Sequence, residues 1–291
     1  GAATVTGNEN IAIGRLSGAS LTSGCNNIHM GCCAGNGSET GCCNVFIGVL
    51  AASAAAVTGN NNLGMGYRAG NNLTSGYENV MLGKDSSLEN TTGYRNVTIG
   101  LGAAQCMQTG CDNVAIGYEA LMGSGTVSSN TGDCNVAIGN LAGRGLCSGC
   151  YNVFLGSNAG NTNTSGDCNI AIGYDVELPS ATGDNQMAIG SGTNRWLTGD
   201  SSYNVTVNHI NATKFCGDGS CLTGTGFGAD AQENLYAGTN AGAASDADTC
   251  ANIALGCNAG CLLNSGDCNI FIGKSAGNGA TSGSYNIGIG C

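Results

Sequence analysis

Residues 152–168 read NVFLGSNAGNTNTSGDC, and variants of this 17-residue unit fill most of the chain. The unit opens with the pattern Asn–apolar–x–apolar–Gly, which occurs sixteen times, usually 17 residues after the previous copy. The copies begin at Asn10, Asn27, Asn44, Asn62, Asn79, Asn96, Asn113, Asn135, Asn152, Asn169, Gln186, Asn204, Asn234, Asn252, Asn269 and Asn286. A fixed short period is typical of repeat architectures, in which similar units stack along one axis.

We number the motif Asn as position 0 and count along the unit. Positions +1 and +3 are apolar in every copy and alternate with 0, +2 and +4, which indicates strands rather than helices. Gly and Ser-Gly pairs mark turns every few residues. We therefore predict an all-β chain, a parallel β-solenoid or β-roll of about sixteen 17-residue coils. Each strand would pair with the same strand of the next coil, about 4.8 Å away.

The period slips in two places, with a step of 22 residues after Asn113 and one of 30 after Asn204. We predict regular repeats over residues 1–173, with a loop insertion at about 118–131, and further repeats over 232–291. Residues 174–231, which contain Pro179 and Trp196, are predicted to form an irregular junction or knob. The chain starts and stops in phase with the repeat, so we expect a piece of a longer polypeptide or a unit that stacks end to end.

Two columns of the repeat carry structural predictions. Side-chain amides at position 0 can hydrogen-bond from coil to coil, so we expect an Asn ladder rather than a ligand site. Its members are Asn10, Asn27, Asn44, Asn62, Asn79, Asn96, Asn113, Asn135, Asn152, Asn169, Asn252, Asn269 and Asn286. The Gly at +4 is replaced only once, by Asn208, and we expect a backbone conformation or close approach that excludes a side chain.

Position +2 is also apolar in most copies. If +1 and +3 fill the coil interior, the +2 side chains face outward and need a partner, most simply another copy of the chain. The sequence thus predicts a homo-oligomer with Phe46, Met81, Phe154 and Phe271 in its interface. The alternative is a single-chain solenoid with scattered exposed alanines.

The eighteen cysteines favour an oxidising, extracellular setting. Nine of them lie at positions −2 and −1, and neighbouring coils are close enough for disulfide bonds. Candidate pairs are Cys25–Cys42, Cys111–Cys134, Cys150–Cys168, Cys250–Cys268 and, within one small loop, Cys216–Cys221, with Cys257–Cys261 a further local possibility. Free buried thiols are the alternative, and some bridges could cross between chains.

Composition argues against several other functions. A net charge of −11 with only 8 Lys and Arg disfavours nucleic acid and anionic membranes as partners, and no apolar run reaches the length of a membrane span. The two histidines, His29 and His209, belong to no nucleophile–base arrangement, so we expect no enzyme and no cofactor. The CxxC at Cys147 and Cys150 lacks the second ligand pair that a zinc site requires, so no metal is predicted.

The unit resembles the head repeats of trimeric autotransporter adhesins and related repeats of phage tail fibres, over residues 8–190 and 232–290. The likeness is carried by the NVAIG segments at 113–117 and 135–139 and by the Ala-Gly turns at 66–70 and 156–160. It implies a left-handed β-roll with three chains packed around an axis. Residues 212–224, ATKFCGDGSCLTG, are similar to an element of phage fibre proteins, although the family repeats are shorter and poor in Cys.

These observations predict a structural, extracellular fibre segment, phage-tail-fibre-like or adhesin-like, that gives reach and surface display for attachment to an unknown cell-surface receptor. The alternatives are a secreted ice- or carbohydrate-binding solenoid and a glycan-depolymerase fibre. The Thr column at +12 is interrupted by Glu39, Gln108 and Cys147, which argues against a regular ice-binding array.

Overall fold

The structure is a computed structural model that describes residues 5–54, 56–123, 131–207, 232–246 and 249–291. The chain divides into two compact units, residues 1–211 and 212–291, and each is described by itself. The described elements are strands joined by turns, and no described helix could span a membrane. The insertion at about 118–131 is described only at its two ends, and His209, Cys216, Cys221 and the element at 212–224 lie outside the described residues.

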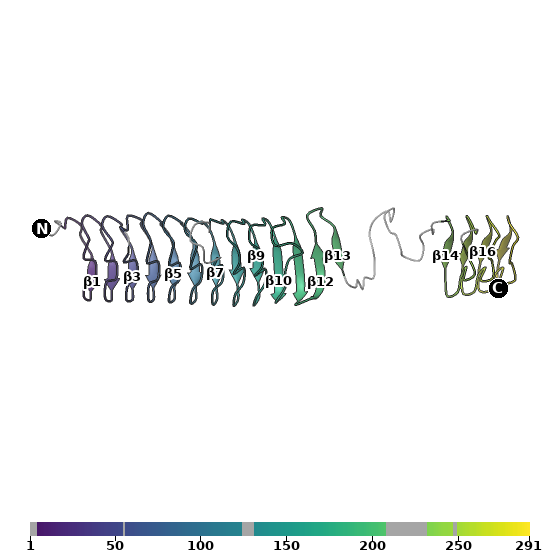
Figure 1. Cartoon of the computed structure of the whole chain (residues 1–291), viewed down its shortest axis with the longest axis horizontal. Coiled ribbons are helices and arrows are strands. Elements are labelled where there is room, and N and C mark those ends of the chain that lie inside the picture. Colours follow the sequence, from purple (N-terminus) through teal and green to yellow (C-terminus); the bar gives the residue numbers. More distant parts are fainter. Residues whose placement is uncertain (1–4, 55, 124–130, 208–231, 247–248) are drawn as a thin grey trace. The chain divides into compact units, whose positions relative to one another are not determined.

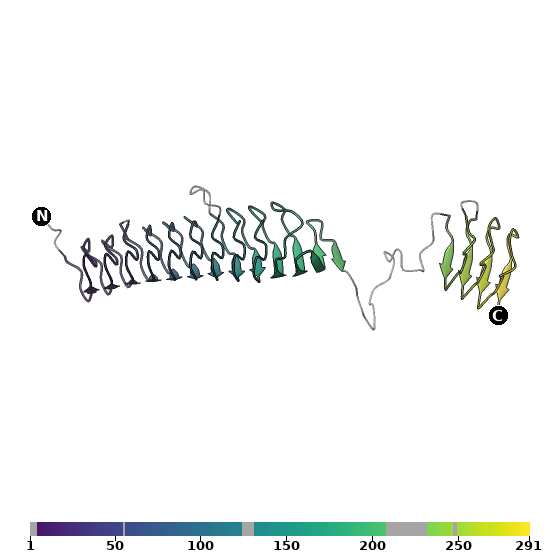
Figure 2. The same cartoon turned by 60° about the horizontal axis from the view of Figure 1, so that its bottom comes forward.

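The first unit is a parallel β-solenoid that ends in two antiparallel strands (Figures 1 and 2). The parallel strands are β1 (Ile11–Ile13), β2 (Ile28–Met30), β3 (Val45–Ile47), β4 (Leu63–Met65), β5 (Val80–Leu82), β6 (Val97–Ile99), β7 (Val114–Ile116), β8 (Val136–Ile138), β9 (Val153–Leu155), β10 (Ile170–Tyr174) and β11 (Met187–Ser191). They follow one another in chain order and are joined in register, as in the pairing of Val136 with Val153. β12 (Asn194–Gly199) and β13 (Val205–Val207) then extend the same sheet.

The second unit repeats the parallel arrangement. It contains β14 (Leu235–Ala237), β15 (Ile253–Leu255), β16 (Ile270–Ile272) and β17 (Ile287–Ile289), paired in chain order. Fifteen of the sixteen motif copies therefore form parallel strands, eleven in the first unit and four in the second. The copy at Asn204 forms β13, which runs antiparallel to β12.

The turns of each coil depend on backbone conformations with positive φ. In the coil of β8, the −1 residue Cys134 has φ 58° and the +6 residue Leu141 has φ 57°. The +4 residue Gly139 has φ 140°, and a Cβ there would lie 2.4 Å from the carbonyl oxygen of Gly156 in the next coil. Both reasons expected for the +4 glycines, a special backbone conformation and a close approach, therefore apply at this position.

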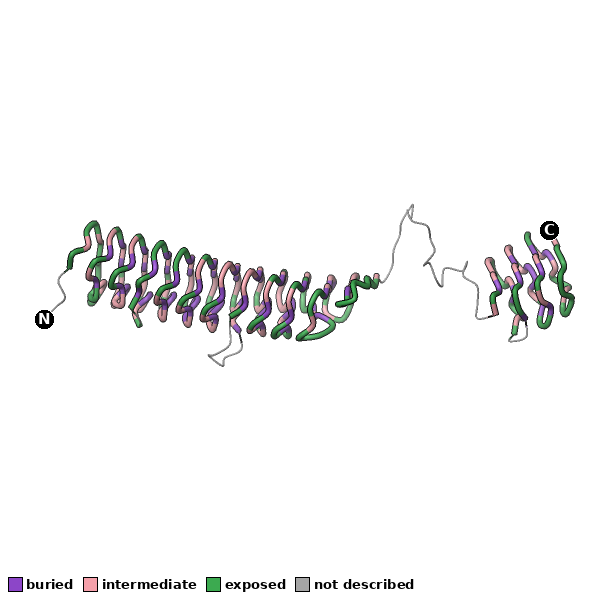
Figure 3. Tube along the Cα trace, turned by 90° about the horizontal axis from the view of Figure 1, so that it is seen from above, coloured by how far each residue is buried: buried purple, intermediate pink, exposed green. Residues whose placement is uncertain are grey.

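The interior of each coil is narrow and is lined by the +2 residue of the strand and by the +7 and +11 residues of the return segments. In the coil of β8 these are Ala137, Ala142 and Leu146, and all three are buried. Figure 3 shows that buried positions recur with the period of the coil in both units. The interior side of the strand is therefore the side that carries 0 and +2, and positions +1 and +3 lie on the outer side.

The parallel ladder extends further along the first unit than the sequence indicates. β10 and β11 pair in parallel through Tyr174 and Ser191, which is beyond the expected boundary at residue 173. The described irregular part is the antiparallel pair β12–β13. The extension occurs because the coil around Gln186 keeps the motif despite its altered position 0.

Candidate functional site

The outer side of the strands is an apolar surface that runs along the sheet of each unit. It is formed by the +1 and +3 residues, which are aliphatic in every described parallel strand. These side chains are half-buried or exposed, for example Ile138 at 36% and Leu155 at 44%. We call this surface the outer strand face. A continuous apolar surface of this kind is typical of a face that another molecule covers.

Residues that follow the strand widen the outer strand face. The +5 position carries the exposed side chains Val49, Tyr67, Leu101 and Tyr118, each a few residues after its strand.

The residues predicted for the oligomer interface lie inside the coils, and that prediction is wrong. Phe46, Met81 and Phe154 are fully buried and Phe271 is 3% exposed. Both sides of the strand are apolar, so period-two alternation alone could not say which side faces inward. The +2 side is inside because the Ala at +7 and the Gly at +8 leave room for it there.

A sequence signal for this arrangement exists in the pairing of residue sizes. Phe154 lies against Gly143 and Gly160, two +8 glycines whose Cβ atoms would come within 2.4 Å of its ring. Phe271 lies against Gly277 in the same way. Large +2 residues with a small residue at +8, which is Gly, Ala or Ser, indicate that the two columns share one interior, whereas +1 and +3 show no such compensation.

The position-0 residues form a buried hydrogen-bonded ladder. In a typical step, the Oδ1 of Asn135 accepts hydrogen bonds of 3.0 Å from both the backbone N and the Nδ2 of Asn152. The Nδ2 of Asn135 donates to the carbonyl oxygen of Gly149 at 2.9 Å. The Asn135 amide thus ties its coil to the next at three points, and buried amides need such partners. The role of this column is structural in both units.

The ladder of the first unit changes at Gln186. Its backbone N still donates to Asn169 Oδ1, at 2.7 Å, but its longer side chain turns back on its own coil. Gln186 Nε2 donates to the carbonyl oxygens of Ser180 and Gly183. The amide ladder therefore stops at the last parallel coil of this unit, where the antiparallel strands begin.

The residues at position −2 form a second hydrogen-bonded ladder. In it, the thiol of Cys and the carboxylate of Asp are equivalent acceptors in successive coils. Asp133 N donates to Cys150 Sγ at 3.3 Å, and Cys150 N donates to Asp167 Oδ1 at 2.7 Å. The Cys150 thiol also lies 3.6 Å from the carbonyl oxygen of Ser148, to which it donates. Cys at −2 therefore serves as an acceptor and donor within the ladder.

Thirteen of the sixteen cysteines that the structure describes are free thiols, among them Cys25, Cys42, Cys111, Cys134, Cys150, Cys168 and Cys268. The predicted bridges Cys25–Cys42, Cys111–Cys134, Cys150–Cys168 and Cys250–Cys268 are absent, although each pair lies on adjacent coils. Sulfurs of the −2 column point at main-chain groups instead of at a partner sulfur, as Cys42 Sγ does in accepting from Cys25 N. Burial raises the pKa of the Cys111 thiol above its ordinary value, which keeps this thiol protonated at neutral pH.

His29 occupies a +2 position inside the second coil. It is 1% exposed and stacks on Phe46 with 5.6 Å between the ring centroids. Burial lowers the pKa of His29 to about 4, so the ring is neutral at pH 7. Among the described residues, no group of three or more His, Cys, Asp or Glu side chains is placed to hold a metal ion.

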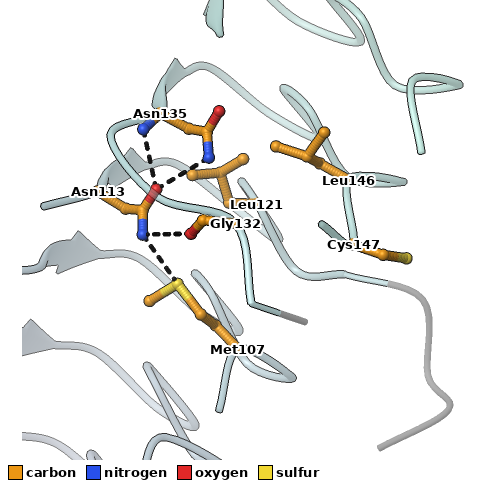
Figure 4. A pocket seen from close by; sticks show the side chains of 7 residues that line it. All are labelled: Met107, Asn113, Leu121, Gly132, Asn135, Leu146 and Cys147. Carbon is orange, nitrogen blue, oxygen red and sulfur yellow. Dashed lines mark hydrogen bonds between the residues drawn. The ribbon is translucent and has the colours of Figure 1, made fainter. Parts of the chain in front are cut away.

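A small void inside the first unit lies beside the 22-residue step (Figure 4). It is lined by Met107, Asn113, Leu121, Gly132, Asn135, Leu146 and Cys147 and has a volume of about 10 Å³. Such a volume holds one water molecule at most. The void belongs to the coil interior and is no ligand site.

The fold and its surface define a class, a parallel β-solenoid repeat protein with a filled interior and a continuous apolar outer strand face. No protein-family model, no curated protein and no solved structure matches the chain.

Proposed function

We propose that the chain is a structural segment of an extracellular fibre, phage-tail-fibre-like or adhesin-like, in which copies pack through the outer strand face. The repeat resemblance makes a left-handed homotrimer the preferred assembly. The fibre would give reach and display an attachment region to a cell-surface receptor. The observation that supports this proposal most directly is the outer strand face, which is formed by exposed residues such as Ile13, Met65 and Leu155 along the parallel strands.

Physical reasoning supports assembly over a solitary chain. Burial of apolar surface contributes roughly 25 cal/mol for each Å² removed from water. A face of mainly Ile, Val and Leu side chains, repeated from coil to coil, offers a large area at a modest cost in side-chain entropy. The interior is already filled by +2, +7 and +11, so the outer face cannot be covered from within the same coil.

The Thr column at +12 does not favour the ice-binding alternative. The hydroxyls of Thr22, Thr74 and Thr164 donate to carbonyl oxygens of the next coil, so their protons are engaged in the ladder. Measurable thermal hysteresis would favour the ice-binding alternative over the fibre proposal. Hydrolysis of a bacterial surface glycan would favour the glycan-depolymerase alternative.

The molar mass in solution tests the assembly, measured by light scattering after gel filtration with and without reductant. The chain mass is 28.6 kDa, so a trimer has about three times that mass, roughly 86 kDa. The double variant Ile138→Lys/Leu155→Lys places charges on the outer strand face, and we expect it to lower the mass to that of one chain. The control is Leu262→Lys, which changes a 53% exposed apolar residue outside the strands. A wild-type mass of one chain contradicts the proposal.

A further inference from the structure

The end of the first unit differs from its coils in how the sheet is covered. Within the described part of the first unit, β11 is the last parallel strand, and the antiparallel strands β12 and β13 continue the sheet. Along β1–β11 the inner side of each strand is covered by the return segments of its coil. Among the described residues no return segment covers the inner side of β12 and β13 in this way, and a hollow of about 290 Å³ lies there.

A β-bulge places Arg195 on this inner side. Ala188, at a buried +2 position, pairs with Thr198, whereas Gly190 pairs with Arg195, and the register shifts between Ile189 and Gly190. Residues 195 and 198 would lie on opposite sides of a regular strand because side chains alternate. The extra residue at Trp196 brings Arg195 to the side of Thr198, and bulges commonly redirect side chains in this manner.

Three threonines and an asparagine line the same hollow as Arg195. The hollow is lined by Thr193, Asn194, Arg195, Thr198 and Thr206. Thr206 pairs directly with Thr198 across the two strands, so both hydroxyls lie on the side of the hollow. In eight of the eleven parallel strands of this unit the +2 residue on the same side is Ala, Phe or Met, whereas here the side carries several hydrogen-bonding groups.

The guanidinium of Arg195 is not matched by a carboxylate. Arg68, Arg95 and Arg144 each form an ion pair with an acidic residue of a neighbouring coil. Arg195 forms none with any residue that the structure describes, and its buried Nε atom has no hydrogen-bond partner. A guanidinium with no carboxylate partner among the described residues is suited to bind a carboxylate through its planar fork.

We propose that this hollow binds a small, hydroxyl-rich molecule that carries a carboxylate, which in chemical terms is an acidic sugar. Arg195 takes the carboxylate, and the threonine hydroxyls and the Asn194 amide take the sugar hydroxyls. The volume of about 290 Å³ suits one or two sugar rings. The hollow is on the opposite side of the sheet from the outer strand face, so packing through that face leaves it accessible. The proposal extends the attachment role but does not depend on the number of chains.

Ligand-observed saturation-transfer NMR with the full chain tests this site, since it detects weak binding. The probes are glucuronic acid, glucose and acetate, titrated separately. We expect saturable binding of glucuronic acid, and at least roughly tenfold weaker binding of glucose and of acetate, because each of these lacks one half of the recognised groups. Equal binding of acetate and glucuronic acid would overturn the sugar assignment, and the absence of saturable glucuronic acid binding would overturn the site.

Variants locate the binding within the molecule. Arg195→Gln is expected to weaken glucuronic acid binding roughly tenfold or more, and Thr198→Val about threefold, through loss of a charged and a neutral hydrogen bond. Arg15→Gln is the matched control, because Arg15 is an exposed arginine of the first coil. Circular dichroism establishes that each variant is folded. Equal loss in Arg15→Gln and Arg195→Gln would refute the assignment to the hollow.

Discussion

The coils of β7 and β9 fill interiors of the same width in opposite ways. At β9, the large residue is Phe154 at +2, and the +8 residue is Gly160. At β7, the +2 residue is the small Ala115, and the buried +8 residue is Leu121. The strands of both coils pair in register with their neighbours, so side-chain volume is exchanged between the +2 and +8 columns while the strand pairing is kept.

Gly160→Leu tests this exchange directly. The new side chain would enter the space of Phe154, since a Cβ at Gly160 lies 2.3 Å from its ring, and we expect a loss of roughly 4 kcal/mol in unfolding free energy. The double variant Phe154→Ala/Gly160→Leu copies the β7 arrangement. It should recover about 2 kcal/mol relative to the sum of the single changes. Denaturant unfolding at fixed protein concentration measures both values.

The backbone itself permits this change, because Leu121 adopts φ 48° at the equivalent position. Gly279→Leu is the control, since no heavy atom lies within 4 Å of the Cβ position there. If the double variant is no more stable than additivity predicts, the columns do not share a common volume.

Asn135→Leu tests whether the position-0 amide ladder, which runs through the coils of β7 and β9, stabilises the stacking of neighbouring coils. The change leaves the carbonyl of Gly149 and two donors of Asn152 without partners, and we expect a loss of about 3 kcal/mol. The exposed Asn140 provides the control as Asn140→Leu, which should change stability little. Chemical denaturation compares the two, and similar losses would mean that the amides contribute nothing specific.

His29 occupies a coil of the β9 type, since it lies against Gly18 and Gly35. Its pKa falls from 6.5 to about 4 on folding because burial disfavours the charged ring, so the unfolded chain binds more protons between these values. The unfolding free energy therefore carries no penalty from His29 above pH 6.5 and falls as the pH drops toward 4. The loss due to His29 is about 2 kcal/mol between pH 7 and pH 5.

The matched variant is His29→Phe, which copies the Phe154 arrangement and removes this titration. Thermal unfolding from pH 7 to pH 4 should show a shallower decline for the variant, while carboxylate titration affects both proteins equally. Parallel curves would show that His29 is not the group responsible.

The smallest change in unfolding free energy is expected for substitutions in the ladder at position −2. Cys150→Ser keeps both hydrogen bonds and should cost less than 1 kcal/mol, whereas Cys150→Val leaves the Asp133 N–H unpaired and should cost about 1 kcal/mol more. Reductant should leave the melting temperature of the wild-type chain unchanged, because Cys25, Cys42, Cys111, Cys134, Cys150 and Cys168 are free thiols. A fall of several degrees on reduction would indicate disulfides in solution.

The repeat made much of the fold predictable. The positions of the parallel strands, their one-coil register, the stacking of the Asn column and the need for glycine at +4 all follow from a period that brings identical residues together. The site was less predictable. The strand pattern places Phe46 and Met81 on the outer side, whereas the structure buries them inside the coils. The pattern fails here because both sides of the strand are apolar, so alternation alone does not identify the inner side. Arg195 could not be placed, because the bulge at Trp196 has no sequence signature.

The sequence by itself determined that this chain is a stack of parallel strands, because a constant period leaves only one way to align the copies. Only the tertiary structure decided which side of the strand is the core. That choice depends on the volume available at +7, +8 and +11, which belong to distant parts of each coil. It also decided that the −2 thiols bond to the main chain, and that a polar hollow opens where the coils end. These features depend on how side chains are directed in space, which column spacing does not specify.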